Sequence, residues 1–396
     1  MLSVEQALEK LLSAAHPVTD VESVDTMLAA GRVLAVEVVS AIDVPPLDNS
    51  QMDGYAVRTA DVPGASTTLR VSQRIAAGQV GGPLEPGTAA RIFTGAPIPA
   101  GADAVIMQEK CEAVGDKVTL NERPSRGEAI RKAGIDIARD DVVSKPGVRL
   151  KPQHCALAAS IGARRLTVYR RLRVATFFTG DELVMPGEPL PPGSIYNSNR
   201  FMLRGLLESL GCEVNDLGIV PDKLQQTRAA LASAAARADL IISSGGVSVG
   251  DEDHVKPAVQ AEGTLDLWQI AMKPGRPLAF GRVRDVPFIG LPGNPVSSFV
   301  TFVLFARPFI LQRQGRIETL RVLPLRADFD WEQSSRRREF MRARFNDQGG
   351  LDIFPNQNSS VLTSVTWADG LIDNPSEHLI RAGDIVRFLP LAELQS

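Results

Sequence analysis

The sequence has few of the residues that build metal centres and covalent catalysts. Among 396 residues there are 3 cysteines and 4 histidines. Cys111, Cys155 and Cys212 lie far apart and match no zinc-ligand spacing, which argues against a zinc site. No Ser/His or Cys/His constellation supports a covalent enzyme intermediate. We expect buried free thiols, and their odd number fits a reducing compartment.

The chain also lacks an excess of charge and a long apolar run. Its formal net charge is −3, which gives no basic surface for nucleic acid or an anionic membrane. The longest apolar stretch, Phe299–Ala306, is too short to span a bilayer. The first 15 residues predict an amphipathic helix capped by Ser3 and not a signal peptide. We therefore expect a cytoplasmic protein without nucleic-acid or membrane partners.

The length and the texture of the chain predict several domains, because 396 residues exceed what one core usually organises. Residues 1–45 and 137–170 predict helices and a strand and together form an N-terminal linking domain. Residues 46–136 contain short β-type runs between Gly/Pro clusters, which is typical of a small inserted β domain. Residues 320–396 return to short strands without a predicted helix, which favours a C-terminal β-barrel or sandwich.

Between these parts, residues 171–319 alternate strand and helix patterns. The predicted strands are Leu172–Phe178, Val214–Val220, Leu240–Ser243 and Val286–Gly290. The predicted helices are Ser198–Leu210, Asp222–Arg237, Asp253–Ala261 and Pro295–Gln312. Such alternation gives a mostly parallel sheet covered by helices on both faces. The predicted fold class is thus multidomain α/β plus β.

Three predicted strand ends carry unusual chemistry, and ligands of open α/β sheets bind at such ends. The first strand runs into Thr179, Gly180, Asp181 and Glu182. Two adjacent acids at a glycine turn can simply be solvated. Their position at the end of a strand favours a function.

The predicted strand Leu240–Ser243 runs into a glycine-rich loop that leads into a helix. Its candidate ligand-binding residues are Ser244, Gly245, Gly246, Ser248 and Gly250. Glycines let backbone N–H groups approach a ligand, and a helix N-terminus favours an anion. A side chain at Gly246 is expected to block that approach while leaving the fold intact. The acids at 251–253 can instead cap the helix, which is compatible with ligand binding.

The predicted strand Val286–Gly290 is followed by a proline-rich loop, which also leads into a helix. The candidates here are Pro292, Gly293, Asn294, Pro295, Ser297 and Ser298. Proline suits the first helical position, and the two serines can offer hydroxyls to a phosphate. Two anion-receptive loops at one sheet edge suggest a ligand with more than one anionic group.

Two cations, Lys273 and Arg276, lie in the proline-stiffened turn KPGRP at 273–277. This pattern suits the capture of an oxyanion, although a surface turn with incidental charges remains an alternative. Acids beside bound phosphates would repel them, so a divalent cation such as Mg²⁺ is the natural mediator.

The motifs taken together resemble a known family. They are TGDEL (179–183), SGGVSVGDED (244–253), KPGRP (273–277) and LPGNPVSS (291–298), with PPLDNSQMDGYA (45–56) and RIFTGAP (91–97) in the first half. In order and spacing this set resembles the molybdenum-insertion enzymes of molybdenum-cofactor biosynthesis, the molybdopterin molybdenumtransferases. The resemblance covers essentially the whole chain and extends to the C-terminal region of gephyrin.

The resemblance implies an elongated homodimer of four-domain chains with a pterin on the α/β domain. The implied reaction inserts molybdate into adenylyl-molybdopterin and releases AMP. From the acids beside the phosphates we expect Mg²⁺ as cofactor, with Glu182 and Asp253 as its ligands. The implied catalytic residues are Asp53, Thr94, Asp136, Glu182, Asp222, Asp253 and Lys273, and more weakly Arg342 and Ser359 or Ser360. Further implied partners are the molybdopterin adenylyltransferase and molybdoenzyme chaperones.

The chain departs from the family pattern at three places. Arg276 stands where lysine is common, Gln269 stands where some members have a second lysine, and GIDIARDD at 134–141 changes the setting of Asp136. Two other classes stay open: a scaffold that kept the fold, and the sister adenylyltransferase. The sister type resembles the α/β domain alone, so the additional domains argue against it. The sequence does not distinguish molybdate from tungstate.

Overall fold

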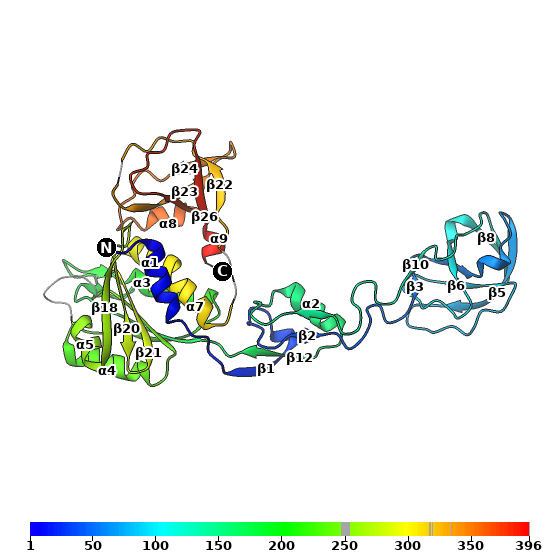
Figure 1. The fold of residues 1–396 in the computed structure, drawn as a ribbon, viewed down its shortest axis with the longest axis horizontal. Coiled ribbons are helices and arrows are strands. Elements are labelled where there is room, and N and C mark those ends of the chain that lie inside the picture. The colour runs from blue at the N-terminus through cyan, green and yellow to red at the C-terminus, as the bar shows by residue number, and fades with distance from the viewer. Residues whose placement is uncertain (247–253, 317, 319, 334, 396) are drawn as a thin grey trace.

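The computed structural model describes residues 1–246, 254–316, 318, 320–333 and 335–395. The predicted site residues Ser248, Gly250 and Asp253 lie outside them. The molecule is elongated (Figure 1): an α/β domain carries the C-terminal domain, and a slender linking unit leads to a β domain at the far end.

The sheet of the α/β domain has six strands, of which four are parallel. In spatial order the strands are β16 (Glu213–Ile219), β13 (Arg173–Phe178), β17 (Leu240–Ser244), β21 (Val286–Leu291), β20 (Pro277–Val283) and β18 (Gly263–Gln269). The first four pair in parallel, whereas β20 and β18 form an antiparallel edge. The sequence predicted the parallel strands and missed this edge hairpin.

Helices cover both faces of the sheet. They are α3 (Ser198–Ser209), α4 (Leu224–Ala235), α5 (Val255–Glu262), α6 (Pro295–Thr301) and α7 (Arg307–Arg313). Successive residues of β13 serve two different cores: Val174 and Phe178 pack in one cluster, and Ala175 and Phe177 in the other. A strand buried on both faces must be apolar throughout, which explains the continuous aliphatic run.

The N-terminal helix α1 (Val4–Ser13) packs with the α/β domain and not with the linking unit where its sequence position had placed it. Ser3 caps it in a capping box, as predicted, and Ala7 and Leu11 are fully buried. These two side chains belong to the core that also contains Phe309 of α7. The linking unit therefore begins after α1.

Besides the short 3₁₀ helix at Thr26–Leu28, the linking unit contains two small antiparallel ladders and one α-helix. These elements are β1 (Val21–Asp25) with β12 (Arg165–Tyr169), β2 (Val38–Val39) with β11 (Val142–Ser144), and α2 (Pro152–Ser160). Its joint with the α/β domain is polar: Arg170 donates to both carboxylate oxygens of Asp239, at 2.6 and 2.9 Å. Arg173 of β13 donates its backbone N–H to the same carboxylate at 2.9 Å.

The β domain is built on a six-stranded mixed sheet. In spatial order its strands are β7 (Ala104–Met107), β4 (Gly54–Val57), β6 (Thr88–Ile92), β5 (Thr67–Ile75), β9 (Lys117–Leu120) and β8 (Cys111–Val114). A second ladder joins β3 (Asn49–Ser50) and β10 (Ile130–Arg131). Both chain connections of this domain run to the linking unit (Figure 1).

The C-terminal domain shares a sheet with the α/β domain. The order is β19 (Met272–Lys273), β23 (Arg338–Phe345), β25 (Gly370–Asn374), β26 (Ile385–Pro390) and β22 (Leu323–Arg326), with β24 (Leu351–Ile353) paired to β23. Strand β19 comes from the α/β part of the chain. Two short helices that the sequence did not predict are α8 (Thr363–Trp367) and α9 (Leu391–Leu394).

Two sequence predictions need correction here. Only Cys212 is buried, whereas Cys111 and Cys155 are half-buried, and all three are free thiols. Burial raises the pKa of Cys212 to about 12, so its thiol is inert. The apolar stretch from residue 299 extends into a helical run over Pro295–Arg313 that is long enough to cross a membrane. It is 78% buried inside the protein, as a core helix is.

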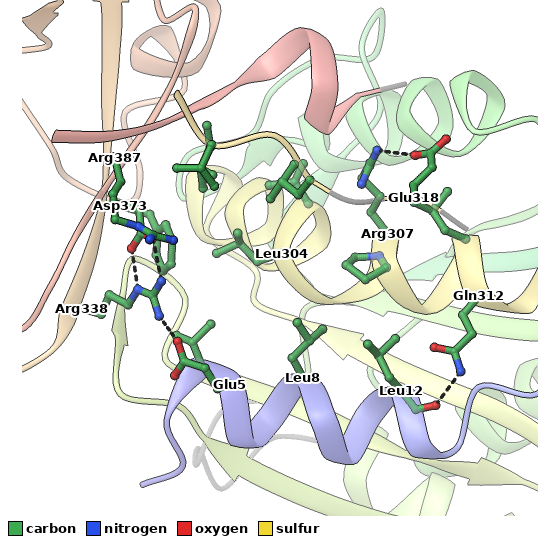
Figure 2. Close-up of a pocket in the computed structure, with 18 of the residues that line it drawn as sticks. Glu5, Leu8, Leu12, Leu304, Arg307, Gln312, Glu318, Arg338, Asp373 and Arg387 are labelled. Atoms are coloured by element: carbon green, nitrogen blue, oxygen red, sulfur yellow. Dashed lines mark hydrogen bonds and ion pairs between the residues drawn. The ribbon is translucent and has the colours of Figure 1, made fainter. Parts of the chain in front are cut away.

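A cavity of about 690 Å³ lies where α1, α7 and the C-terminal sheet meet (Figure 2). Leu8 and Leu304 line its apolar middle. At one end Arg338 is bound by Asp373, at 2.7 Å, and by Glu5 of α1. The described residues of its wall include none of the predicted site residues.

Candidate functional site

A second cavity, of about 790 Å³, lies at the carboxyl ends of the parallel strands. All three loops singled out in the sequence contribute to its wall. The predicted residues that line it are Thr179, Gly180, Glu182, Asp222, Ser244, Gly245, Gly246, Pro292, Gly293, Asn294, Pro295 and Ser297. Residues more than 100 positions apart along the chain thus meet at one sheet edge, where the topology of an open α/β sheet places a ligand.

The glycines of the second loop are required by the protein itself. Gly245 has φ +92°, and a Cβ there would lie 2.4 Å from the carbonyl oxygen of Thr179. Gly246 has φ +67°, and its Cβ would lie 2.3 Å from Cγ2 of Val255. Only glycine fits such positions without strain. The expectation that a side chain at Gly246 would leave the fold intact is therefore wrong.

Asn199 of α3 joins the second and third loops, and the sequence analysis missed it. Its Nδ2 donates to Oγ of Ser244 at 2.9 Å and to the carbonyl oxygen of Gly293 at 2.7 Å. Ser244 in turn donates to the carbonyl oxygen of Pro292 at 3.1 Å. The available signal was Asn197-Ser198-Asn199 at the start of a predicted helix, which suggests only a cap.

Several buried polar atoms of the cavity wall have no hydrogen-bond partner among the described residues. They are Oγ1 of Thr179, Nδ2 of Asn197 and Oδ1 of Asn199. Leaving a buried polar group unsatisfied costs about 1–3 kcal/mol. A polar ligand or ordered water in the cavity would satisfy them.

Among the described residues, two carboxylates line this cavity. Glu182 is exposed, and Asp222 is half-buried and accepts the backbone N–H of His254 at 3.4 Å. Asp181 is exposed and does not belong to the described part of the wall. Within the described ranges no group of three or more His, Cys, Asp and Glu side chains is arranged to hold a metal ion.

The KPGRP turn lies beside the cavity and not on its wall, apart from Pro277. Arg276 is exposed. Lys273 donates its ammonium to Oε1 of Glu339 at 3.0 Å. Ser298 is fully buried and is likewise absent from the part of the wall that the structure describes. Lys273 and Arg276 thus precede Pro277 of the cavity wall in the chain but do not line the cavity. Only a ligand that extends beyond the cavity could contact them.

The C-terminal domain closes one side of the cavity. Ser360 and Leu362 line it, and Val296 donates its N–H to the carbonyl oxygen of Ser359 at 3.0 Å. Arg342 lies instead inside the C-terminal domain, 1% exposed, where it donates to Oγ of Ser364 at 3.1 Å. Burial lowers the pKa of Arg342 to about 10. Of the weaker candidates, Ser360 lies on the cavity wall, Ser359 lies next to it in the chain, and Arg342 lies in a core.

Asp53 and Thr94 form a separate pair at the edge of the β domain. Oδ1 of Asp53 accepts the N–H of Thr94 at 2.8 Å and its hydroxyl at 2.7 Å. These hydrogen bonds hold the pKa of Asp53 below its usual range, with a smaller contribution from the charge of Arg91. Asp136 is exposed on the connection back to the linking unit. Figure 1 shows the β domain at the opposite end of the molecule from the α/β domain.

Comparison with known families assigns the chain along almost its full length. Residues 2–162 match the MoeA N-terminal region (domain I and II), residues 175–312 match a probable molybdopterin binding domain, and residues 324–391 match the MoeA C-terminal region (domain IV). A molybdopterin molybdenumtransferase of Haemophilus influenzae is 41% identical over 89% of each chain. The chain belongs to the molybdopterin molybdenumtransferase family.

Other relatives agree with this membership. Molybdopterin molybdenumtransferase 2 of Mycobacterium tuberculosis is 36% identical over 94% of each chain. The solved structure of a molybdopterin biosynthesis MoeA protein from Pyrococcus horikoshii OT3 has a TM-score of 0.86 at 28% identity, covering 98% of this chain and 100% of the other. The family and the enzyme class predicted from the sequence motifs are confirmed, as is a multidomain α/β architecture with mixed sheets.

Proposed function

We propose that the chain is a cytoplasmic enzyme that inserts molybdate into adenylyl-molybdopterin and releases AMP. The observation that carries the proposal is the cavity at which the two glycine loops converge. Its volume of about 790 Å³ suits a ligand with two linked groups, and family membership supplies the chemistry.

The two loops would hold the phosphates through backbone groups. Pro295 begins a helical run, so the dipole of its first turn favours an anion there, although Pro295 has no N–H and that of Val296 already donates to Ser359. Ser297 offers a hydroxyl at the same place. The unsatisfied atoms of Thr179, Asn197 and Asn199 would pair with polar groups of the bound nucleotide or pterin. This division explains why the wall mixes glycine backbone with buried amides.

The acids of the cavity fit a magnesium ion better than a free phosphate. Mg²⁺ binds through one or two carboxylates together with substrate phosphate oxygens, so it does not need a cluster of three protein ligands. Glu182 and Asp222 would supply carboxylates, with the predicted ligand Asp253 outside the described residues. When bound, the ion neutralises charge on the phosphoanhydride.

Lys273 and Arg276 would hold molybdate beside the cavity, because fixed cations stabilise an oxyanion as it reacts. An oxygen of water or molybdate then displaces AMP from the phosphoanhydride. The two dithiolene sulfurs bind the molybdenum while one molybdate oxygen leaves as water with their two protons. Neither step needs a nucleophile from the protein. Contacts with the adenylyltransferase and with molybdoenzyme chaperones stay predictions.

The test is product identity with the purified full chain. Adenylyl-molybdopterin, molybdate and Mg²⁺ should yield AMP, and Glu182→Gln should lower the rate and its Mg²⁺ dependence more than it weakens binding of the adenylylated pterin. Consumption of ATP instead would identify an adenylyltransferase. Binding without any AMP would identify a scaffold.

A further inference from the structure

Glu339, in the C-terminal domain, is buried beside the KPGRP turn although nothing in the sequence motifs pointed to it. Its side chain is 4% exposed. A carboxylate removed from water is unfavourable unless it is paired and hydrogen-bonded, so its partners matter. Both of its oxygens have one: Oε1 accepts the ammonium of Lys273 at 3.0 Å, and Oε2 accepts Nε1–H of Trp331 at 3.1 Å.

Backbone pairing sets this contact. Strand β19 pairs in parallel with β23, with Met272 opposite Arg338 and Lys273 opposite Glu339. Arg338 is fixed by Asp373 of β25 at 2.7 Å. The register of the two strands, and not a flexible surface encounter, therefore brings the lysine to the glutamate.

The two ends of the ion pair differ in exposure. The side chain of Lys273 is 38% exposed, against 4% for Glu339. The carboxylate is therefore the fixed partner, and the ammonium keeps a face from which it can reach an anion. Three N–H donors on the ammonium allow it to bind Glu339 and a second oxyanion together.

We propose that Glu339 is a positioning residue for the oxyanion: it holds the ammonium of Lys273 at the domain junction so that Lys273 meets molybdate without first being ordered. This inference rests on the proposed function, since it assumes that Lys273 contacts molybdate. The C-terminal domain thereby contributes to the reaction through a group that does not touch the substrate. The benefit is preorganisation, because a lysine side chain otherwise loses rotamer freedom on binding.

The experiment compares Glu339→Gln, Lys273→Ala and the double variant in the full chain, with molybdate as the titrated ligand. Glu339→Gln keeps the shape and removes the charge. We expect the molybdate concentration for half-maximal AMP release to rise about tenfold, the effect of losing one charge-assisted contact. The maximal rate and the affinity for AMP should change less than twofold. Calorimetric titration with molybdate gives a readout that does not depend on turnover.

Matched variants separate positioning from folding. Glu332→Gln removes an exposed carboxylate of the same domain, bound to Arg381 at 2.7 Å, and should change nothing. Glu339→Asp retains the charge and should recover part of the loss. If Glu339→Gln fails to fold, Trp331→Phe removes only the second donor to Glu339 and should give a smaller rise in the same direction.

The double variant decides the mechanism. If Glu339 acts through Lys273, the double variant should need no more molybdate than Lys273→Ala does. A further rise in the double variant, an unchanged requirement in Glu339→Gln, or a lowered one would overturn the inference while leaving the proposed function in place. An unchanged requirement in Lys273→Ala would overturn both, because the lysine would then have no role with molybdate.

Discussion

The α/β domain and the β domain present their candidate residues in opposite ways. The cavity of the α/β domain is lined by three loops, the start of a helix and one segment of the C-terminal domain. The β domain presents Asp53 and Thr94 as a single hydrogen-bonded pair at the end of two strands. The first is a cavity lined by many residues, whereas the second is one hydrogen-bonded pair of side chains.

The separation of the two regions bears on whether one chain can form the site alone. Figure 1 places the β domain at the far end of the linking unit, away from the cavity. If Asp53 and Glu182 act on one ligand, the β domain of one subunit must face the α/β domain of another. A two-fold dimer brings such complementary surfaces together twice. We therefore propose a site shared between subunits.

The strongest test of this comparison mixes two inactive subunits. Asp53→Ala and Glu182→Ala should each lower activity by about 100-fold or more. After subunit exchange, roughly half of the dimers are heterodimers. In a shared arrangement each heterodimer has one doubly altered site and one intact site, so activity should return to roughly a quarter of the original.

The alternative outcome is equally clear. If each site is built within one chain, every site in the mixture keeps one lesion and no activity returns. Mass spectrometry must confirm that the subunits exchanged. As a control, two separate preparations of Asp53→Ala are mixed and exchanged in the same way, and this mixture should stay inactive.

The joint between the α/β domain and the linking unit can be loosened without changing a residue of the cavity wall or of the Asp53–Thr94 pair. Asp239→Asn removes the charge bound by Arg170 and Arg173 and should lower the free energy of unfolding by about 2 kcal/mol. Ligand affinity of the cavity should be unchanged, while activity that depends on the other domain should fall. Denaturant unfolding and calorimetry with AMP measure the two effects. Weakened AMP binding would contradict the separation.

The same variant has a defined pH dependence. Burial opposes ionisation of Asp239, but hydrogen bonds from Arg170 and Arg173 outweigh it and lower its pKa below the usual value. A depressed pKa contributes stability above the unfolded value of about 3.9, and this is lost as the pH falls through the folded pKa. The difference between the original chain and the variant should thus be constant near neutrality and shrink below about pH 4.

The sequence could predict the α/β domain because its signals are local. Continuous aliphatic runs and helix patterns repeat along 172–312, and strands β13, β17 and β21 lie where those runs are. The edge strands β18 and β20 were missed because buried and exposed residues do not alternate regularly along them. Trp268 of β18 and Phe280 of β20 contact each other across the two strands. The pairing that joins β19 to β23 depends on residues 66 positions apart, which no local pattern contains.

The candidate site was predictable to the same extent. Glycine loops at strand ends carry their own signature, so Gly245 and Gly293 were found. Asn199 and Glu339 were missed because their importance comes from what they touch: a serine and a carbonyl oxygen in one case, a lysine in the other. Polar residues inside a helix or a strand look alike in sequence whether they are exposed or hold a loop.

A smaller effect distinguishes the roles of glycines within the cavity. Gly246→Ala should destabilise the fold by about 1–3 kcal/mol, since its Cβ would meet Val255 at a positive φ. Gly293→Ala should not, because the nearest atom to its Cβ is Cα of Gly245 at an ordinary 3.8 Å. Its methyl group should instead weaken AMP binding by about 1 kcal/mol. Equal thermal unfolding of both variants would contradict this distinction.

The smallest predicted effect concerns Thr94→Val in the β domain. This change removes the hydroxyl donor at 2.7 Å from Asp53 and keeps the backbone N–H at 2.8 Å. Because hydrogen bonds to the ionised form lower a carboxyl pKa, the pKa of Asp53 should rise but remain below its usual range. NMR of the carboxyl carbon during an acid titration measures this directly.

The functional consequence tests whether the pair is prepared before it meets its ligand. Asp53 would stay ionised at neutral pH in Thr94→Val, so any loss of activity must come from its lost orientation and not from its charge. We expect activity to fall several-fold at all pH values above about 6, while the acidic limb of the profile moves to higher pH only by the rise in the pKa of Asp53. A loss that disappears at higher pH would show instead that Thr94 acts by keeping Asp53 ionised.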